Sequence, residues 1–185
     1  WAVIFGNGYE DTGGNGTAKL FIAYLDGGLD GTWTLNTYYI KIDTGSGSSS
    51  HRNGLASPAL VDLDGNGKVD RAYAGDLKGN LWVFDLSSGS SGSWALAYGA
   101  SKPLFTTQSN QPITTEPLIV KHPSVSTTDT NKPNVLVLFG TGQYLIEGDK
   151  SSTNKQSVYG VWDDGAATAK PLALDKLVKQ TITTG

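Results

Sequence analysis

Short apolar runs alternate with glycine- and serine-rich stretches along this chain, and two kinds of run recur in the same order. Runs of the first kind end in glycine, and runs of the second kind are rich in aromatic residues and end in aspartate. The first kind occupies residues 3–9, 72–76 and 135–142, the second occupies 38–43, 80–85 and 157–163, and proline-led runs open two units at 57–61 and 116–120. Short apolar and aromatic runs bounded by glycine and proline predict β-strands.

A unit of several strands that recurs along a chain is typical of a β-propeller, in which each unit forms one blade. The pattern predicts an all-β fold, a modified β-propeller with about three blades in this chain. Since about four to eight blades close a propeller, we expect the remaining blades to lie outside this sequence or on another chain. Polar inserts at 45–53, 86–93 and 125–133 lengthen the units and are typical of mobile surface loops.

The two ends of the chain differ from its middle. Residues 1–165 are expected to form the blades and residues 166–185 a C-terminal tail, in which 172–179 fits two turns of helix or, nearly as well, a strand. The opening run from Trp1 to Phe5 resembles the inside of a strand, with no signal peptide before it. We therefore expect an internal piece of a longer protein whose targeting sequence lies upstream.

Residues 62–70, Asp-Leu-Asp-Gly-Asn-Gly-Lys-Val-Asp, carry the most specific motif of the chain. Calcium takes about six to eight oxygen ligands, and a tight loop with an oxygen donor at alternate residues surrounds one point with them. Positions 1, 3, 5 and 9 predict side-chain ligands, position 7 predicts a backbone carbonyl, and glycine stands at position 6. The expected calcium ligands are Asp62, Asp64, Asn66, Lys68 through its carbonyl, and Asp70.

The flanking residues predict that this loop joins two strands. Leu60 to Asp64 alternates apolar and acidic residues, and a short β-type run from Arg71 to Gly75 follows. Position 12, a glutamate in EF-hands, is Tyr73, so Asp70 has to close the ligand shell. The alternative is a solvated turn without an ion, because Asp, Asn and Gly also dominate turns. The full ligand spacing favours calcium.

Composition excludes several function classes. A formal net charge of -3 and the lack of a Lys/Arg cluster argue against nucleic acid or an anionic membrane as a partner. No apolar run approaches the length of about 18 residues that predicts a membrane span. The chain has no cysteine, which removes disulfides, thiolate nucleophiles and cysteine–metal sites.

Three alternatives to a regulatory calcium site in a non-enzymatic domain are open. A quinone-dependent propeller enzyme would need a catalytic constellation, and the histidines, His51 and His122, lie in a Ser-rich loop and before a proline; we therefore expect no catalysis. A carbohydrate- or matrix-binding propeller would use exposed aromatic residues. The candidates are Trp33, Tyr38, Tyr39 and Trp94, although aromatic residues in blades more often pack in the core. The ion could also be a purely structural staple. The acidic stretch 26–31 predicts a hairpin turn rather than a second metal site.

Beyond these physical patterns, the order of the motifs is similar to that of a known family. The calcium loop followed by residues 73–86, and then the blocks 111–117, 139–145 and 158–163, resemble the C-terminal propeller of the PilY family of type IV pilus tip-associated proteins. The resemblance covers residues 1–165. It implies a modified propeller with one calcium site, and it places the family's ligands on the five residues of the loop named above.

The resemblance also implies a function and partners. It implies a role in pilus assembly, retraction control and attachment to a host or abiotic surface, outside the cell at the pilus tip, with an association with the outer membrane also open. The expected partners are tip components such as minor pilins and the N-terminal part of the same protein. The Arg-Gly-Asp tripeptide of some adhesive members is absent from this sequence, so integrin binding through it is unsupported.

Overall fold

The computed structural model describes residues 1–125, 132–168 and 170–180 and arranges them in three antiparallel sheets. The first sheet has the order β1 (Ala2–Gly6), β2 (Thr17–Tyr24), β3 (Tyr39–Gly47). The middle sheet contains β4 (Ala59–Val61), β5 (Arg71–Gly75), β6 (Asn80–Asp85), β7 (Ala95–Leu96) and β8 (Phe105–Thr106). The third sheet contains β9 (Leu118–Lys121), β10 (Val135–Gly140) and β11 (Val158–Asp163). Three short 3-10 turns, η1 (Ser91–Ser93), η2 (Glu147–Ser151) and η3 (Leu174–Lys176), are the helical elements of the described residues.

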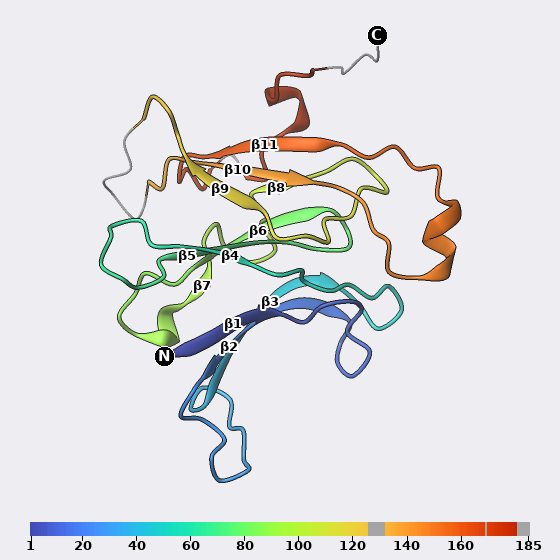
Figure 1. Cartoon of the computed structure of the whole chain (residues 1–185). Helices are drawn as coiled ribbons and strands as arrows, with labels where there is room; N and C mark the ends of the chain where they lie inside the picture. The colour runs from blue at the N-terminus through green and yellow to red at the C-terminus, as the bar shows by residue number, and fades with distance from the viewer. Residues whose placement is uncertain (126–131, 169, 181–185) are drawn as a thin grey trace.

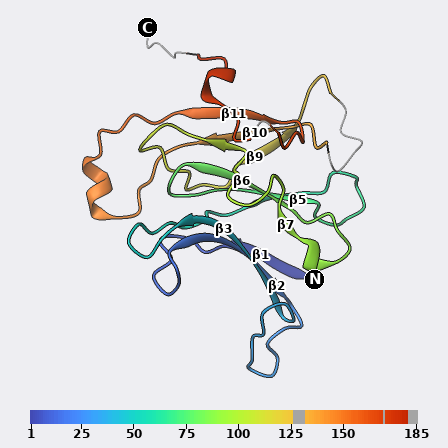
Figure 2. The ribbon, with the colours of Figure 1, turned by 180° about the vertical axis from the view of Figure 1, so that it is seen from behind.

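The three sheets are stacked in chain order, and two opposite views agree that the middle sheet lies between the other two (Figure 1, Figure 2). Each sheet is a meander, since β1 pairs with β2 and β2 with β3, and the same neighbours pair in the other sheets. The fourth strand of the middle sheet is broken in two, because β7 and β8 pair with opposite ends of β6. This arrangement confirms the all-β fold of about three blade-like units.

The hydrophobic core forms two layers, one on each face of the middle sheet. Along β6, Leu81 and Val83 belong to the layer shared with the third sheet, and Trp82 and Phe84 belong to the layer shared with the first sheet. Successive side chains of a strand point to opposite faces. A strand buried on both faces therefore has a continuous apolar run, which explains the unbroken pattern of residues 81–84.

The outer faces of the two end sheets are also partly apolar. On the first sheet Phe5 is 44% exposed and stacks on Phe21, with 5.6 Å between ring centroids. On the third sheet Leu118 and Val158 are 60% and 84% exposed. The stack thus presents apolar side chains at both ends as well as between its layers.

One strand assignment from the sequence was wrong. The pattern groups the run 3–9 with 72–76 and 135–142, but β1 occupies the first position of its sheet, like β4 and β9. The strand equivalent to β5 and β10 is β2, which the pattern did not predict. The pattern missed β2 because this strand contains buried polar residues. Thr17 and Lys19 are only 5% and 6% exposed. Lys19 is buried because its Nζ forms an ion pair with Asp11.

The polar inserts are more ordered than loops of that composition suggest. β3 extends to Gly47, into the first insert, and Asn53 at the end of that insert is fully buried. The second insert contains η1. Most of the third, residues 126–131, lies outside the described residues. The predicted hairpin turn at 26–31 is confirmed as part of the β2–β3 connection.

The tail forms neither the two-turn helix nor the continuous strand that the sequence left open. Residues 172–179 contain the single turn η3 and one bridge, between Leu172 and Phe105, in which the Leu172 N–H donates to the Leu104 carbonyl at 2.8 Å. Leu172 and Leu177 pack against the core layer between the middle and third sheets. In the described part of the chain, no helix has the length and apolar character needed to cross a membrane.

Candidate metal centre

The loop of residues 62–70 connects β4 to β5, whose register places Ala59 opposite Tyr73 and Val61 opposite Arg71. This confirms the hairpin predicted from the flanks. Gly65 and Gly67 have φ angles of +78° and +81°, a left-handed conformation that glycine adopts without strain. A Cβ on either glycine would meet no atom within 4 Å. The backbone conformation of the loop, and not a lack of space, therefore accounts for these glycines.

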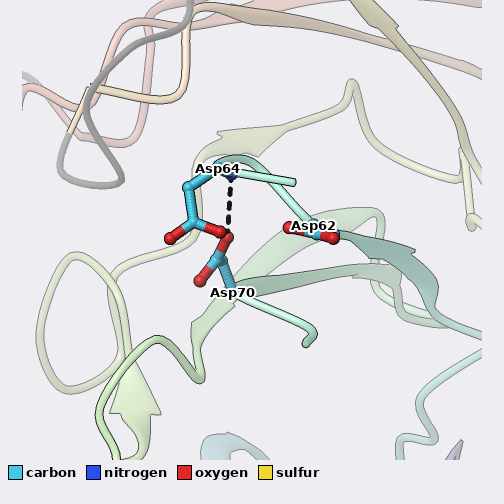
Figure 3. Close-up of side chains that lie close together, drawn as sticks. All are labelled: Asp62, Asp64 and Asp70. Atoms are coloured by element: carbon cyan, nitrogen blue, oxygen red, sulfur yellow. Dashed lines mark hydrogen bonds between the residues drawn. The ribbon is translucent and has the colours of Figure 1, made fainter. Parts of the chain in front are cut away.

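The loop brings three carboxylates together. One oxygen atom each from Asp62, Asp64 and Asp70 lie within 4.8 Å of one another. Figure 3 shows the Asp64 and Asp70 carboxylates facing each other, with Asp62 to one side. Asp62 and Asp64 are exposed, whereas Asp70 is only 3% exposed. The cluster is open to solvent on one side and anchored in the fold on the other.

Backbone N–H groups fix the position of Asp62. Its carboxylate accepts hydrogen bonds from Gly67 at 2.8 Å, from Gly65 at 2.7 Å and from Asn66 at 3.2 Å. The Gly67 N–H, followed by the other two, lowers the pKa of the Asp62 carboxyl below its usual value. Asp62 is therefore an anion at neutral pH, as a ligand of a hard cation has to be.

The other members of the predicted ligand set lie on the same loop. Asp70 Oδ2 accepts from the Leu63 N–H at 2.7 Å and from the Asp64 N–H at 3.4 Å, the bond dashed in Figure 3. The Asn66 side chain donates to Asp64 Oδ2 at 2.9 Å, and its Oδ1 accepts from the Lys68 N–H at 2.8 Å. Among the described residues, no backbone N–H donates to the Lys68 carbonyl. The structure thus gathers three of the five predicted ligands and joins Asn66 to them.

The donor set suits a hard cation. Every candidate ligand is an oxygen atom, and calcium tolerates irregular shells of such ligands at about 2.3–2.6 Å. The soft sulfur ligands and imidazoles that favour transition metals are absent from the loop. Calcium binding itself stays a prediction.

Comparison with known proteins identifies the fold family. A model of the PilY1 beta-propeller domain matches residues 1–183. The chain belongs to the PilY1 β-propeller family. A crystal structure of the Pseudomonas aeruginosa PilY1 C-terminal domain is similar, with a TM-score of 0.70 and 32% identity, over 90% of this chain and 35% of that one. These matches confirm both the resemblance to the PilY family and the propeller fold.

Full-length relatives give the biological context. The chain is 36% identical over 174 residues to a type IV pilus biogenesis factor PilY1 homolog of Xylella fastidiosa. The aligned region covers 90% of this chain and 11% of the relative. It is 32% identical over 209 residues to the type IV pilus biogenesis factor PilY1 of P. aeruginosa PAO1, which covers 98% of this chain and 16% of the relative. The chain therefore spans only a small part of these relatives. Their names describe a role in pilus biogenesis, which is not an enzymatic one.

Next to the loop, this PilY1-family domain contains a buried polar cluster that the sequence did not predict. Arg71 follows Asp70 and points into the layer between the middle and third sheets, where its Nη1 lies 3.4 Å from Asp163 Oδ2 at the end of β11. Asp163 also accepts hydrogen bonds from the Tyr73 hydroxyl, at 2.8 Å, and from the Tyr98 hydroxyl. Burial, and then the charge of Asp163, raise the pKa of both tyrosines, so both act as donors. The sequence signal was the aspartate that ends each aromatic strand.

A second buried carboxylate, Asp76, connects the first and middle sheets. It is fully buried and accepts five hydrogen bonds of 2.8 to 2.9 Å. The donors are the side chains of Asn53, Asn80 and Trp82 and the backbone N–H groups of Lys78 and Asn80. An ionised carboxylate is stable in a core when donors surround it in this way. The sequence pattern of residues 74–82 does not predict the contact between Asp76 and Asn53.

The residues named for the competing functions fall on several elements, and Tyr38 and Tyr39, which are half-buried, follow Trp33 at the end of the β2–β3 connection and the start of β3. His51 is exposed and forms a hydrogen bond with Ser50, and His122 contacts Trp162 in a tilted arrangement, with 4.8 Å between ring centroids. Trp33 is exposed, whereas Trp94 packs against the core layer between the first and middle sheets. These four side chains therefore belong to separate environments.

Proposed function

We propose that this chain is a calcium-binding propeller domain that acts in type IV pilus biogenesis, regulating pilus extension and retraction and the attachment of pili to host cells or other surfaces. The observation that carries the proposal is the cluster of Asp62, Asp64 and Asp70 within 4.8 Å on the β4–β5 loop. The chain belongs to a family whose relatives are named pilus biogenesis factors, and this membership supports the proposed role in pilus biogenesis.

The ligands are the carboxylates of Asp62, Asp64 and Asp70, the Asn66 side chain and the Lys68 carbonyl. With three carboxylates, we expect a dissociation constant of about 10⁻⁵ to 10⁻³ M, the range of sites that work at extracellular calcium concentrations. A bound calcium ion supplies positive charge that offsets the repulsion among the three carboxylates. Without it, like charges a few ångströms apart push the limbs of the hairpin away from each other.

The loop is placed so that such a movement reaches both core layers. Leu63 packs against the layer between the middle and third sheets, and Val69 packs against the layer between the first and middle sheets. The Leu63 N–H also donates to Asp70. A change in the spacing of the carboxylates therefore alters the contacts of the middle sheet with both neighbours, and this gives calcium a means of regulation.

The proposed partners follow from the family. They are the remaining part of the same protein, tip components such as minor pilins, and the host or abiotic surface. The proposed location is the pilus tip, outside the cell, where calcium is abundant enough to fill a weak site.

Calorimetry on three variants tests the site. Asp64→Asn keeps the size of an exposed side chain and removes one charge, so we expect calcium affinity to fall by about tenfold or more. Asp70→Ala should abolish binding, but it also removes the acceptor of the Leu63 N–H, and Asp70→Lys places an ammonium group at that position. Asp30→Asn is the matched control, because Asp30 is an exposed aspartate in the β2–β3 turn. Equal binding of magnesium, or no heat with calcium, would contradict the site.

Assays of pili in cells distinguish a regulatory role of calcium from a purely structural one. Cells whose full-length protein carries Asp64→Asn or Asp70→Ala should extend, retract and attach differently from wild type, and Asp70→Lys should resemble permanent neutralisation. If all three variants lose calcium and yet twitching motility and attachment match those of Asp30→Asn, the ion is only a folding staple.

A further inference from the structure

A hollow of about 320 Å³ lies between the ends of the middle and third sheets, away from the calcium loop. Its walls come from the β8–β9 connection, from Leu77 in the β5–β6 connection, and from the β10–β11 connection that contains η2, which is drawn in orange in Figure 1. Four carboxamide side chains line it, those of Asn110, Gln143, Asn154 and Gln156. Its size is at the lower end of the range for small-molecule sites, about 300–1,000 Å³.

Hydrogen bonds hold the two connections together. The Gly142 N–H donates to the Pro112 carbonyl at 2.8 Å. The Gln111 side chain, which is 4% exposed, donates to the Lys155 carbonyl at 3.1 Å and to Ser157 Oγ at 2.9 Å. The walls are thus fixed before a ligand arrives, which reduces the entropy lost on binding.

Gln156 holds the backbone of Asn110 and Asn154 in place. Its Nε2 donates to the backbone carbonyls of Asn110 and Asn154, both at 3.3 Å, which leaves its Oε1 as an acceptor. Asn110 is held at a φ of +62°. Among the described residues, no hydrogen bond uses the side-chain amides of Asn110 or Asn154. Each of these amides therefore offers two donors and one acceptor group to a ligand.

The charge of the hollow selects among ligands. Among the described residues, Asp149 is the one charged residue that lines the hollow, and its oxygens accept from Gln143 Nε2 at 2.8 Å and from the Leu145 and Ile146 N–H groups at 2.8 and 3.0 Å. No Lys or Arg in the described part of the chain lines the hollow. An anionic ligand would find no opposite charge, and an apolar ligand would leave the amides unpaired. Hydroxyl groups fit, because each of them both donates and accepts.

We propose that this hollow binds a neutral polyhydroxylated ligand, namely a neutral sugar residue of a glycan. The carboxamides of Asn110, Asn154, Gln143 and Gln156 bond to its hydroxyl groups. The site shares no residue with the calcium loop, so a test of sugar binding is independent of whether the loop binds calcium.

Titration of the 185-residue chain, labelled with ¹⁵N, tests the proposal by two-dimensional NMR. The probes are the methyl glycosides of glucose, galactose, mannose and N-acetylglucosamine, with inorganic phosphate as the anionic probe. We expect at least one sugar to shift the side-chain amide signals of Asn110 and Asn154, with a dissociation constant of about 1–10 mM for a single residue. Phosphate should leave these signals unchanged.

Variants assign the binding to the hollow. The double variant Asn110→Gly with Asn154→Ala should weaken sugar binding by at least about tenfold. Asn36→Gly is the matched control, because Asn36 is also exposed and has a φ of +65°, but lies in the β2–β3 connection. Asn154→Asp, an exposed change of one group, gives the same test if the double variant loses its β-sheet circular dichroism. No shift with any sugar up to about 100 mM, equal shifts with phosphate, or full binding by the variants would overturn the proposal.

Discussion

Asp163→Asn is the substitution whose effect the structure defines most sharply. Asp163 is fully buried and receives the Arg71 guanidinium, the hydroxyls of Tyr73 and Tyr98, and the Gly165 N–H at 3.1 Å. Asparagine keeps the shape of the side chain but replaces one accepting oxygen by a donating amide group. The donors that face that oxygen then lose it as an acceptor, and the buried ion pair between Arg71 and Asp163 is broken.

The magnitude follows from the contacts that are lost. Two bonds reach each carboxylate oxygen, and a hydrogen bond to a charged group contributes about 1.5–3 kcal/mol. Losing the two bonds at one oxygen thus costs about 3–6 kcal/mol. Breaking a buried ion pair by removing one partner typically costs about 3–5 kcal/mol. We therefore expect the free energy of unfolding to fall by about 4 kcal/mol, a large part of the stability of a domain of this size.

Urea denaturation followed by tryptophan fluorescence measures this loss. Glu147→Gln is the control, because Glu147 and Lys150 form an ion pair at 2.7 Å with side chains 85% and 54% exposed, and such surface pairs contribute about 0–1 kcal/mol. The double variant Arg71→Met with Asp163→Asn removes the buried cation as well as the carboxylate, keeps one side-chain oxygen as an acceptor for the tyrosine hydroxyls, and should regain part of the lost stability. A loss below about 1 kcal/mol for Asp163→Asn, or a double variant no better than the single one, would refute the reasoning.

Two further predictions concern a close contact and acid stability. Gly75→Ala should destabilise the domain by about 1–3 kcal/mol, because the new Cβ would lie 2.2 Å from Ile113 Cγ2, whereas Gly140→Ala, at the same end of β10 with open space around it, should change stability by less than about 0.5 kcal/mol; equal melting temperatures would contradict this. The ion pair with Lys19 holds the pKa of Asp11 below its usual 3.8, so this pair stabilises the fold above about pH 4, and the contribution is lost as the pH falls through the lower folded-state pKa. Urea midpoints between pH 7 and pH 3 should therefore decline less steeply for Asp11→Asn than for wild type, and identical slopes would show that the pair adds nothing.

The sequence predicted the hairpin of the candidate metal centre because the causes of its shape are local. Aspartates at alternate positions and two glycines with positive φ determine the turn over nine residues, whatever surrounds it. The blade pattern was also visible, since strands buried on one or both faces have distinct apolar periods.

The sequence did not predict the parts of the fold that depend on distant residues. Arg71 and Asp163 meet across two sheets, and Asn53 reaches Asp76 from an insert that its composition marked as a surface loop. β2 was missed because its buried Lys19 depends on Asp11, a partner in the preceding loop. In each case a polar residue is stable in the core only through a contact that a linear pattern does not contain.

The first and third sheets both have apolar outer faces, but these faces carry different residues. The three-layer stack therefore has two unlike ends and a direction from one to the other. Phe5 and Phe21 lie at one end, and Leu118 and Val158 at the other. When unlike ends of such units contact each other, each contact leaves a further end free. A series of these contacts therefore either closes into a ring or extends into a fibre. The rotation between successive blades decides which, and a propeller is the case in which that rotation closes the ring.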